Sequence, residues 1–148
     1  MEKLETIKLN DTEYTLTLNR ESFLRIDRIC DIQKSMEIVR RPLIEHIDEI
    51  DDDYNPLEDE INDETIEKEI ELKDKVMAKL VTNSFFIWLY PKHQLKISQV
   101  KEIIQPYLSD EKKAEFIGSE LTRLLDECVA IRDEYNKEQK NLKALANK

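Results

Sequence analysis

Residues 5–29 read ETIKLNDTEYTLTLNRESFLRIDRI, and this stretch determines the fold that we expect for the N-terminal part of the chain. Tyr14, Leu16 and Leu18 alternate with polar residues, which is the spacing of a strand with one buried face. An Asn-Asp pair separates this run from an earlier one, as the turn of a β-hairpin does. Because an isolated hairpin is only marginally stable in water, we expect it to pack on a helix or to join the sheet of another chain.

Helical spacing follows the hairpin. Asn19 is a suitable N-cap, and apolar residues then recur every three or four positions, as on one face of a helix. The aromatic stretch FFIWLY over 85–90 carries apolar residues on nearly all sides, which predicts burial in the core or against a partner. After it, Pro91 is expected to end the helix and Ser98 to cap the next one.

The sequence therefore predicts a single, mainly α-helical domain over residues 1–148, in which an N-terminal β-hairpin precedes a bundle of about four to five helices. In order, the expected segments are a hairpin over 1–18, a helix over 19–50, an acidic loop over 51–64, a helix over 65–90, a short helix over 98–108, a long helix over 110–140 and a frayed tail over 141–148.

The composition excludes several classes of fold and site. The chain of 148 residues contains one glycine, Gly118. Glycine-rich phosphate loops and dinucleotide fingerprints need several glycines, and so do the repeated tight turns of a many-stranded sandwich or barrel. Because Gly118 lies inside the last predicted helix, we expect it to allow a bend or a close helix crossing.

Acidity is concentrated in one segment. Residues 48–71 hold 13 Asp and Glu residues and one lysine, whereas the whole chain has a formal charge of −10, so the remainder is close to neutral. A general nucleic-acid binder would carry the opposite sign, because Lys and Arg neutralise phosphates. The segment also fails as an EF-hand that starts at Asp51, because Pro56 and Asn62 stand where that loop needs a glycine and a bidentate glutamate.

The residues that most often carry chemistry form no motif. Cys30, Cys128, His46 and His93 stand singly, without the paired spacing of structural zinc sites. We interpret both cysteines as reduced core thiols, although sequence order leaves a Cys–His pair open. We expect no enzyme activity, cofactor or metal. The chain also shows neither a secretory leader nor an apolar run long enough for a membrane span, so we expect a cytoplasmic protein.

The order of the parts resembles a known family. The hairpin ETIKLNDTEYTLTL runs into the capped helix NRESFLRIDRI, and FFIWLY is followed by PKHQLKISQVKEII, a Lys/His connector with a second capped helix. In this order the chain resembles the small tail assembly chaperones of long-tailed phages that infect Gram-positive bacteria. The resemblance covers residues 4–35 and 80–108. The acidic segment departs from it as an insertion, and Gln94 stands where relatives often carry a second histidine.

The resemblance implies a non-enzymatic protein that binds and solubilises the tape measure protein in the host cytoplasm, associates with itself and is absent from the mature virion. Many members of that family also have a longer form made by translational frameshifting. In such a role, apolar helix surface covers the partner and surplus charge keeps the complex soluble. The side chains that we expect at protein contacts are Tyr14, Leu16, Leu18, Phe85, Phe86, Trp88, Leu89 and Tyr90.

Other functions are compatible with the same features. An acidic inhibitor that mimics DNA would place carboxylates in the basic channel of a host DNA-binding defence protein, although here the acids are bunched in one segment. An enzyme would need a deep cavity with perturbed titrating groups around Cys30 or His93. An isolated helical protein with an acidic loop would show these features without a partner.

Overall fold

The computed structural model describes residues 2–40 and 63–146, and it confirms a mainly helical protein with an N-terminal antiparallel hairpin. Along the described chain the elements are β1 (Glu2–Leu9), β2 (Thr12–Asn19), α1 (Arg20–Cys30), α2 (Ile32–Arg40), α3 (Asp63–His93), α4 (Ile97–Leu108) and α5 (Glu111–Ala146). Residues 41–50 of the predicted first helix lie outside the described residues. The predicted acidic loop over 51–64 also lies outside them, apart from residues 63 and 64, which belong to α3.

The hairpin forms because Asn10 and Asp11 supply its tight turn. Both residues have a positive φ, 52° and 66°, which is the conformation of a two-residue type I′ turn. The register pairs Leu9 with Thr12 and turns the apolar side chains of both strands, except that of Leu4, to one face. The buried side chains on that face are Ile7, Leu9, Leu16 and Leu18.

Two helices hold the hairpin in place. The N–H of Thr15, on the outer edge of β2, donates to His93 Nε2 at 2.9 Å, and the ring of Tyr14 stands edge-on to the His93 imidazole with 5.3 Å between centroids. At the turn, the N–H of Asn10 donates to the hydroxyl of Tyr107 on α4 at 2.8 Å. The prediction that the hairpin packs on helices is therefore confirmed.

Asn19 caps α1, as predicted. Its Oδ1 accepts from the Ser22 N–H at 2.7 Å and its own N–H donates to Ser22 Oγ at 3.1 Å, which closes a capping box. The single helix predicted over 19–50 is wrong, because Asp31 has a φ of 48° and separates α1 from α2. The Asp31 carboxylate then accepts from the Lys34 N–H at 3.3 Å in the first turn of α2.

α3 continues past the proline that was expected to end it. Pro91 lies in the last turn, so the one hydrogen bond that its missing N–H removes is at the end of the helix and leaves the preceding turns intact. The helix ends where Gln94 takes a φ of 50° and its N–H donates to the Tyr90 carbonyl at 2.9 Å, a left-handed closure of a helix C-terminus. The N-cap of α4 is Lys96 and not the predicted Ser98.

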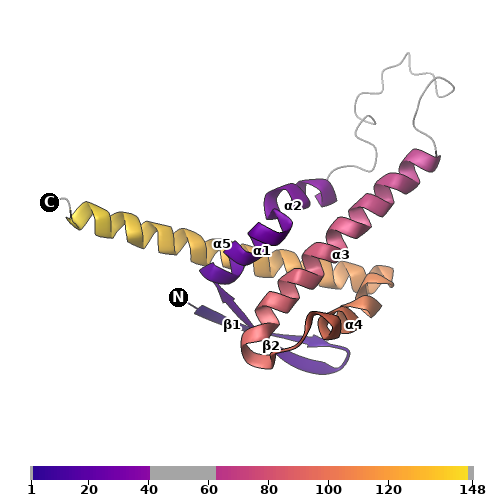
Figure 1. The fold of residues 1–148 in the computed structure, drawn as a ribbon, viewed down its shortest axis with the longest axis horizontal. Coiled ribbons are helices and arrows are strands. Elements are labelled where there is room, and N and C mark those ends of the chain that lie inside the picture. Colours follow the sequence, from indigo (N-terminus) through magenta and orange to yellow (C-terminus); the bar gives the residue numbers. More distant parts are fainter. Residues whose placement is uncertain (1, 41–62, 147–148) are drawn as a thin grey trace, which may run out of the picture.

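α5 is longer than predicted. Asp110 caps it, since the Asp110 Oδ1 accepts from the N–H groups of Lys112 at 2.9 Å and Lys113 at 3.2 Å. The helix then runs to Ala146, so the tail that was expected to fray over 141–148 is helical as far as the described residues extend. Figure 1 shows α5 crossing α3 and continuing beyond the body of the molecule.

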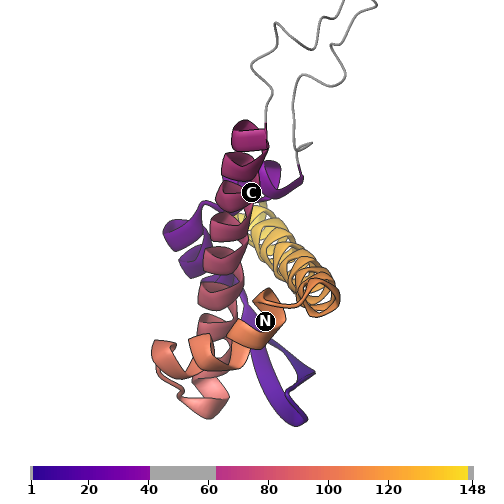
Figure 2. The same ribbon diagram turned by 90° about the vertical axis from the view of Figure 1, so that its right-hand side faces the viewer.

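α3 lies at the centre of the fold. β2, α1, α2, α4 and α5 all pack against it, and Figure 2 shows these elements gathered around its length. The largest buried side chain of the core is Trp88, which is 0% exposed and stands edge-on to Phe85 with 5.6 Å between ring centroids. The buried apolar residues of the hairpin and the helices form one continuous cluster.

Replacing Asp11 by glycine should raise the free energy of unfolding by about 0.5–1 kcal/mol, because glycine adopts a positive φ without steric cost. Asn10→Gly is the matched control, since the Asn10 Nδ2 donates to the Ile103 carbonyl at 3.1 Å and glycine removes that bond. We expect Asn10→Gly to be neutral or destabilising. Urea denaturation followed by circular dichroism measures both changes, and equal gains would contradict a structural role of the Asn10 side chain.

Candidate binding groove

The structure places most of the predicted contact side chains inside the molecule. Leu16, Leu18, Phe85, Trp88 and Leu89 are each 0% exposed, Tyr14 and Phe86 are half-buried, and Tyr90 is 52% exposed. The cause is the position of α3, because neighbouring elements of the same chain cover its C-terminal half on nearly all sides. Five of the eight residues are therefore covered by other parts of the same chain in this fold.

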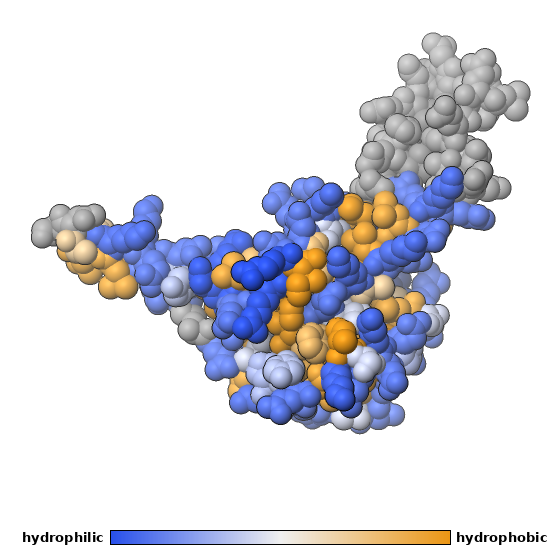
Figure 3. All heavy atoms as spheres, viewed as in Figure 1, coloured by the Kyte–Doolittle hydropathy of each residue, from blue (hydrophilic) through white to orange (hydrophobic). Residues whose placement is uncertain are grey.

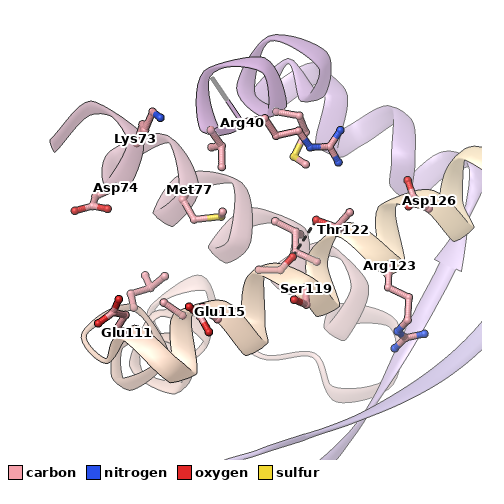
Figure 4. A pocket seen from close by; sticks show the side chains of 16 residues that line it. Arg40, Lys73, Asp74, Met77, Glu111, Glu115, Ser119, Thr122, Arg123 and Asp126 are labelled. Atoms are coloured by element: carbon pink, nitrogen blue, oxygen red, sulfur yellow. Dashed lines mark hydrogen bonds between the residues drawn. The ribbon is translucent and has the colours of Figure 1, made fainter. Parts of the chain in front are cut away.

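An open groove of about 1090 Å³ lies instead between α2, the middle of α3 and the first half of α5. Figure 4 shows α2 and α3 along one side and α5 along the other, with Met77 projecting from α3 into the space between them. The groove thus begins where the elements that cover the C-terminal half of α3 leave the helix uncovered.

Methionines and small residues form the floor of the groove. Met36 comes from α2 and Met77 from α3, and α5 contributes Ala114, Gly118 and Thr122 at four-residue spacing, which places them on one face. A Cβ at Gly118 would lie 3.7 Å from Met77 Cε, an ordinary contact distance. Glycine is therefore not required here for a close helix crossing, and its effect is to leave space in the groove.

Charged side chains border this floor. The charged lining residues are Arg40, Lys73 and Asp74 from α2 and α3, and Glu111, Glu115, Arg123 and Asp126 from α5. Carboxylates are the majority on the α5 side, while cations are the majority on the other. An apolar floor between charged rims is the arrangement that accepts an amphipathic helix, and unequal rims favour one orientation of that helix.

Apolar surface continues from the groove toward the N-terminal end of α3. Ile70, four residues before the groove residue Asp74 and so on the same side of α3, is 41% exposed, and Leu72, on the opposite side of the helix, is 42% exposed. Figure 3 shows apolar side chains, in orange, over the upper half of α3 with hydrophilic side chains around them. The uncovered part of α3 therefore offers more apolar area than the groove alone.

Cys30 and His93 do not form the Cys–His pair that sequence order left open, and His46 lies outside the described residues. The Sγ of Cys30 donates weakly to the Lys79 carbonyl at 3.9 Å, and His93 lies 14 residues further along α3, about 21 Å away at 1.5 Å per residue. Within the described residues, no three His, Cys, Asp or Glu side chains are placed to hold a metal ion. In the same part of the chain, no helix is long and apolar enough to cross a membrane.

Sequence reasoning missed the groove because three elements far apart in the chain build it. The available signal was local: Ala114, Gly118 and Thr122 place three small residues on one face of a long helix. That spacing predicts a shallow face but does not say what lies opposite. The methionines opposite, Met36 and Met77, look like ordinary core positions in the sequence.

The two cysteines are free, and burial raises the pKa of both thiols, that of Cys128 to about 11. We expect the half-buried Cys30 to react with a disulfide reagent such as DTNB in the native protein and Cys128 to react only after unfolding, because the thiolate is the nucleophile. Cys30→Ser should abolish the fast phase, whereas Cys128→Ser should leave it unchanged. Equal native rates for the two thiols would contradict the burial of Cys128.

Comparisons with known proteins give no match: no protein-family model matches the chain, and neither does any curated protein or solved structure.

Proposed function

We propose that this protein is a phage tail assembly chaperone that binds helical segments of the tape measure protein in the host cytoplasm and is absent from the mature virion. The proposed activity is binding alone, without catalysis. A tape measure protein is a long, largely helical chain whose apolar faces are exposed until the tail tube encloses them. The single observation that carries the proposal is the open groove between α2, α3 and α5.

The size of the groove suits a helix. Its lining residues on α5 run from Glu111 to Asp126, about 22 Å of helix at 1.5 Å per residue, which accommodates about four turns of a bound helix. The small residues of α5 allow the backbone of that helix to approach. Met36 and Met77 are unbranched and adapt their shape, so they suit a partner that presents many similar helical segments and not one fixed sequence.

The charge distribution supports the same role. Beside the groove, the first part of α3 reads DETIEKEIE over 63–71, and its residues Glu67 and Glu71 are exposed. A complex that carries an apolar partner needs surplus charge of one sign to stay in solution. The carboxylates of α3 supply this charge, and those on the α5 rim favour a bound helix with basic residues along that flank.

Substituting a small residue of the groove by a large one should block binding. Ala114→Arg places a long side chain on the floor, and Ala130→Arg makes the same change at an exposed position of α5 outside the groove. We expect Ala114→Arg to reduce co-purification with the tape measure protein of the same genome by about tenfold or more, and Ala130→Arg to leave it unchanged. The measurement is the soluble fraction and the stoichiometry of the two proteins after co-expression.

Circular dichroism and thermal unfolding of both variants verify that each is folded. A folded Ala114→Arg variant that binds like the unchanged protein would contradict the groove as the binding site. A tape measure protein that stays insoluble and unbound beside the unchanged chain would contradict the chaperone function itself.

A further inference from the structure

The outer edge of β1 has no strand beside it in the part of the chain that the structure describes. Leu9 and Thr12 flank the two-residue turn, and such flanking residues form a hydrogen-bonded pair. Because pairing alternates along an antiparallel ladder, every even-numbered residue of β1 turns its backbone N–H and C=O away from β2. These residues are Glu2, Leu4, Thr6 and Lys8, and all four are exposed.

The outer edge of β2 differs from that of β1, because α3 packs against β2. By the same alternation the N–H groups of Glu13, Thr15, Thr17 and Asn19 point outward from β2, and two of them have side-chain acceptors: Thr15 donates to His93 Nε2 and Asn19 to Ser22 Oγ. The edge of β1 has no such partner among the described residues, and Leu4 beside it is 54% exposed. An uncovered strand edge is a template for pairing with another strand.

We propose that β1 pairs antiparallel with β1 of a second copy of this chain about a two-fold axis, so that the two hairpins form one four-stranded sheet. Glu2 then lies opposite Lys8 of the second copy, and Leu4 lies opposite Thr6. Both pairs occur twice because the axis is two-fold. The resemblance to tail assembly chaperones implies self-association but no interface, whereas this pairing is argued from the uncovered edge and the charges of β1 and does not need the groove.

The pattern of charges selects this register. Pairing of two outward backbone edges requires even-numbered residues opposite even-numbered ones. Among such registers, the one that places Glu2 opposite Lys8 uses all four edge residues. A shift of the second copy by two residues in either direction leaves at least one of these charges unpaired. In the hairpin Lys8 also lies opposite Glu13, so in the four-stranded sheet its ammonium stands between two carboxylates, a favourable cross-strand arrangement.

The face of β1 that packs on α5 is compatible with the pairing. Lys3 contacts Glu127 at 2.7 Å and Arg123 contacts Glu5 at 3.3 Å, which holds β1 on α5. At the axis, Glu5 lies opposite Glu5 of the second copy. Partial burial opposes its ionisation, but hydrogen bonds from Lys3 and Arg123 outweigh that effect and hold the pKa of Glu5 below its ordinary value. Each of the two facing carboxylates therefore already has cationic partners.

Charge exchange at the edge tests the register. Glu2→Lys and Lys8→Glu each place like charges opposite one another in the homodimer, so each should raise the dissociation constant of the dimer by about tenfold. An equal mixture of the two variants should restore the original affinity, because the lysine introduced in one variant then faces the glutamate introduced in the other. Both variants remain net acidic, so general attraction does not explain a restoration. Sedimentation velocity over a concentration series measures the dimer fraction.

A backbone change tests the edge itself. Thr6→Pro removes an N–H that points away from β2 and leaves the ladder between the strands intact. Thr6→Ala is the matched control, because it keeps that N–H. We expect Thr6→Pro to be folded and monomeric and Thr6→Ala to dimerise like the unchanged chain. A folded chain that is monomeric at the highest soluble concentration, or a variant mixture that does not regain affinity, would overturn the proposal.

Discussion

The burial of the C-terminal half of α3 on nearly all sides is the constraint on which the rest of the structure depends. A helix that carries Phe85 and Trp88 with apolar neighbours around its circumference needs cover from several directions. The hairpin, α4 and α5 each have one apolar face, and each places that face on α3. This cover is supplied within the chain, so the uncovered surface of α3 lies in its N-terminal half, where the cover stops and the groove begins.

Local signals in the sequence predicted those features whose conformation depends on a few adjacent side chains, namely a turn and a helix cap. The Asn10–Asp11 pair predicted the turn of the hairpin, and Asn19 predicted the start of α1, because turn and cap conformations depend on the side chains that occupy them. The helix ends at Asp31 and Gln94 were not predictable in the same way. Both residues adopt a positive φ that is usually the role of glycine, so neither residue type marks the end of a helix in the sequence.

The candidate site was less predictable than the fold, for a physical reason. Periodicity shows that the stretch around Trp88 is buried on all sides, but it does not distinguish burial within a chain from burial against a partner. Periodicity does not reveal the groove at all. Met36, Met77 and Gly118 come from three separate elements, and they form one surface only when those elements meet in the fold. The free edge of β1 falls between these cases: sequence predicts the strand and its register, and the position of α3 decides which of the two edges is covered.

The hydrogen bond from Thr15 to His93 also fixes the chemistry of the imidazole. A ring nitrogen that accepts a hydrogen bond carries no proton, so the neutral ring is the tautomer with its hydrogen on Nδ1. Attachment of the hairpin to the end of the central helix therefore depends on a single ring atom, because the tautomer with its hydrogen on Nδ1 presents Nε2 as the acceptor for the amide of the strand.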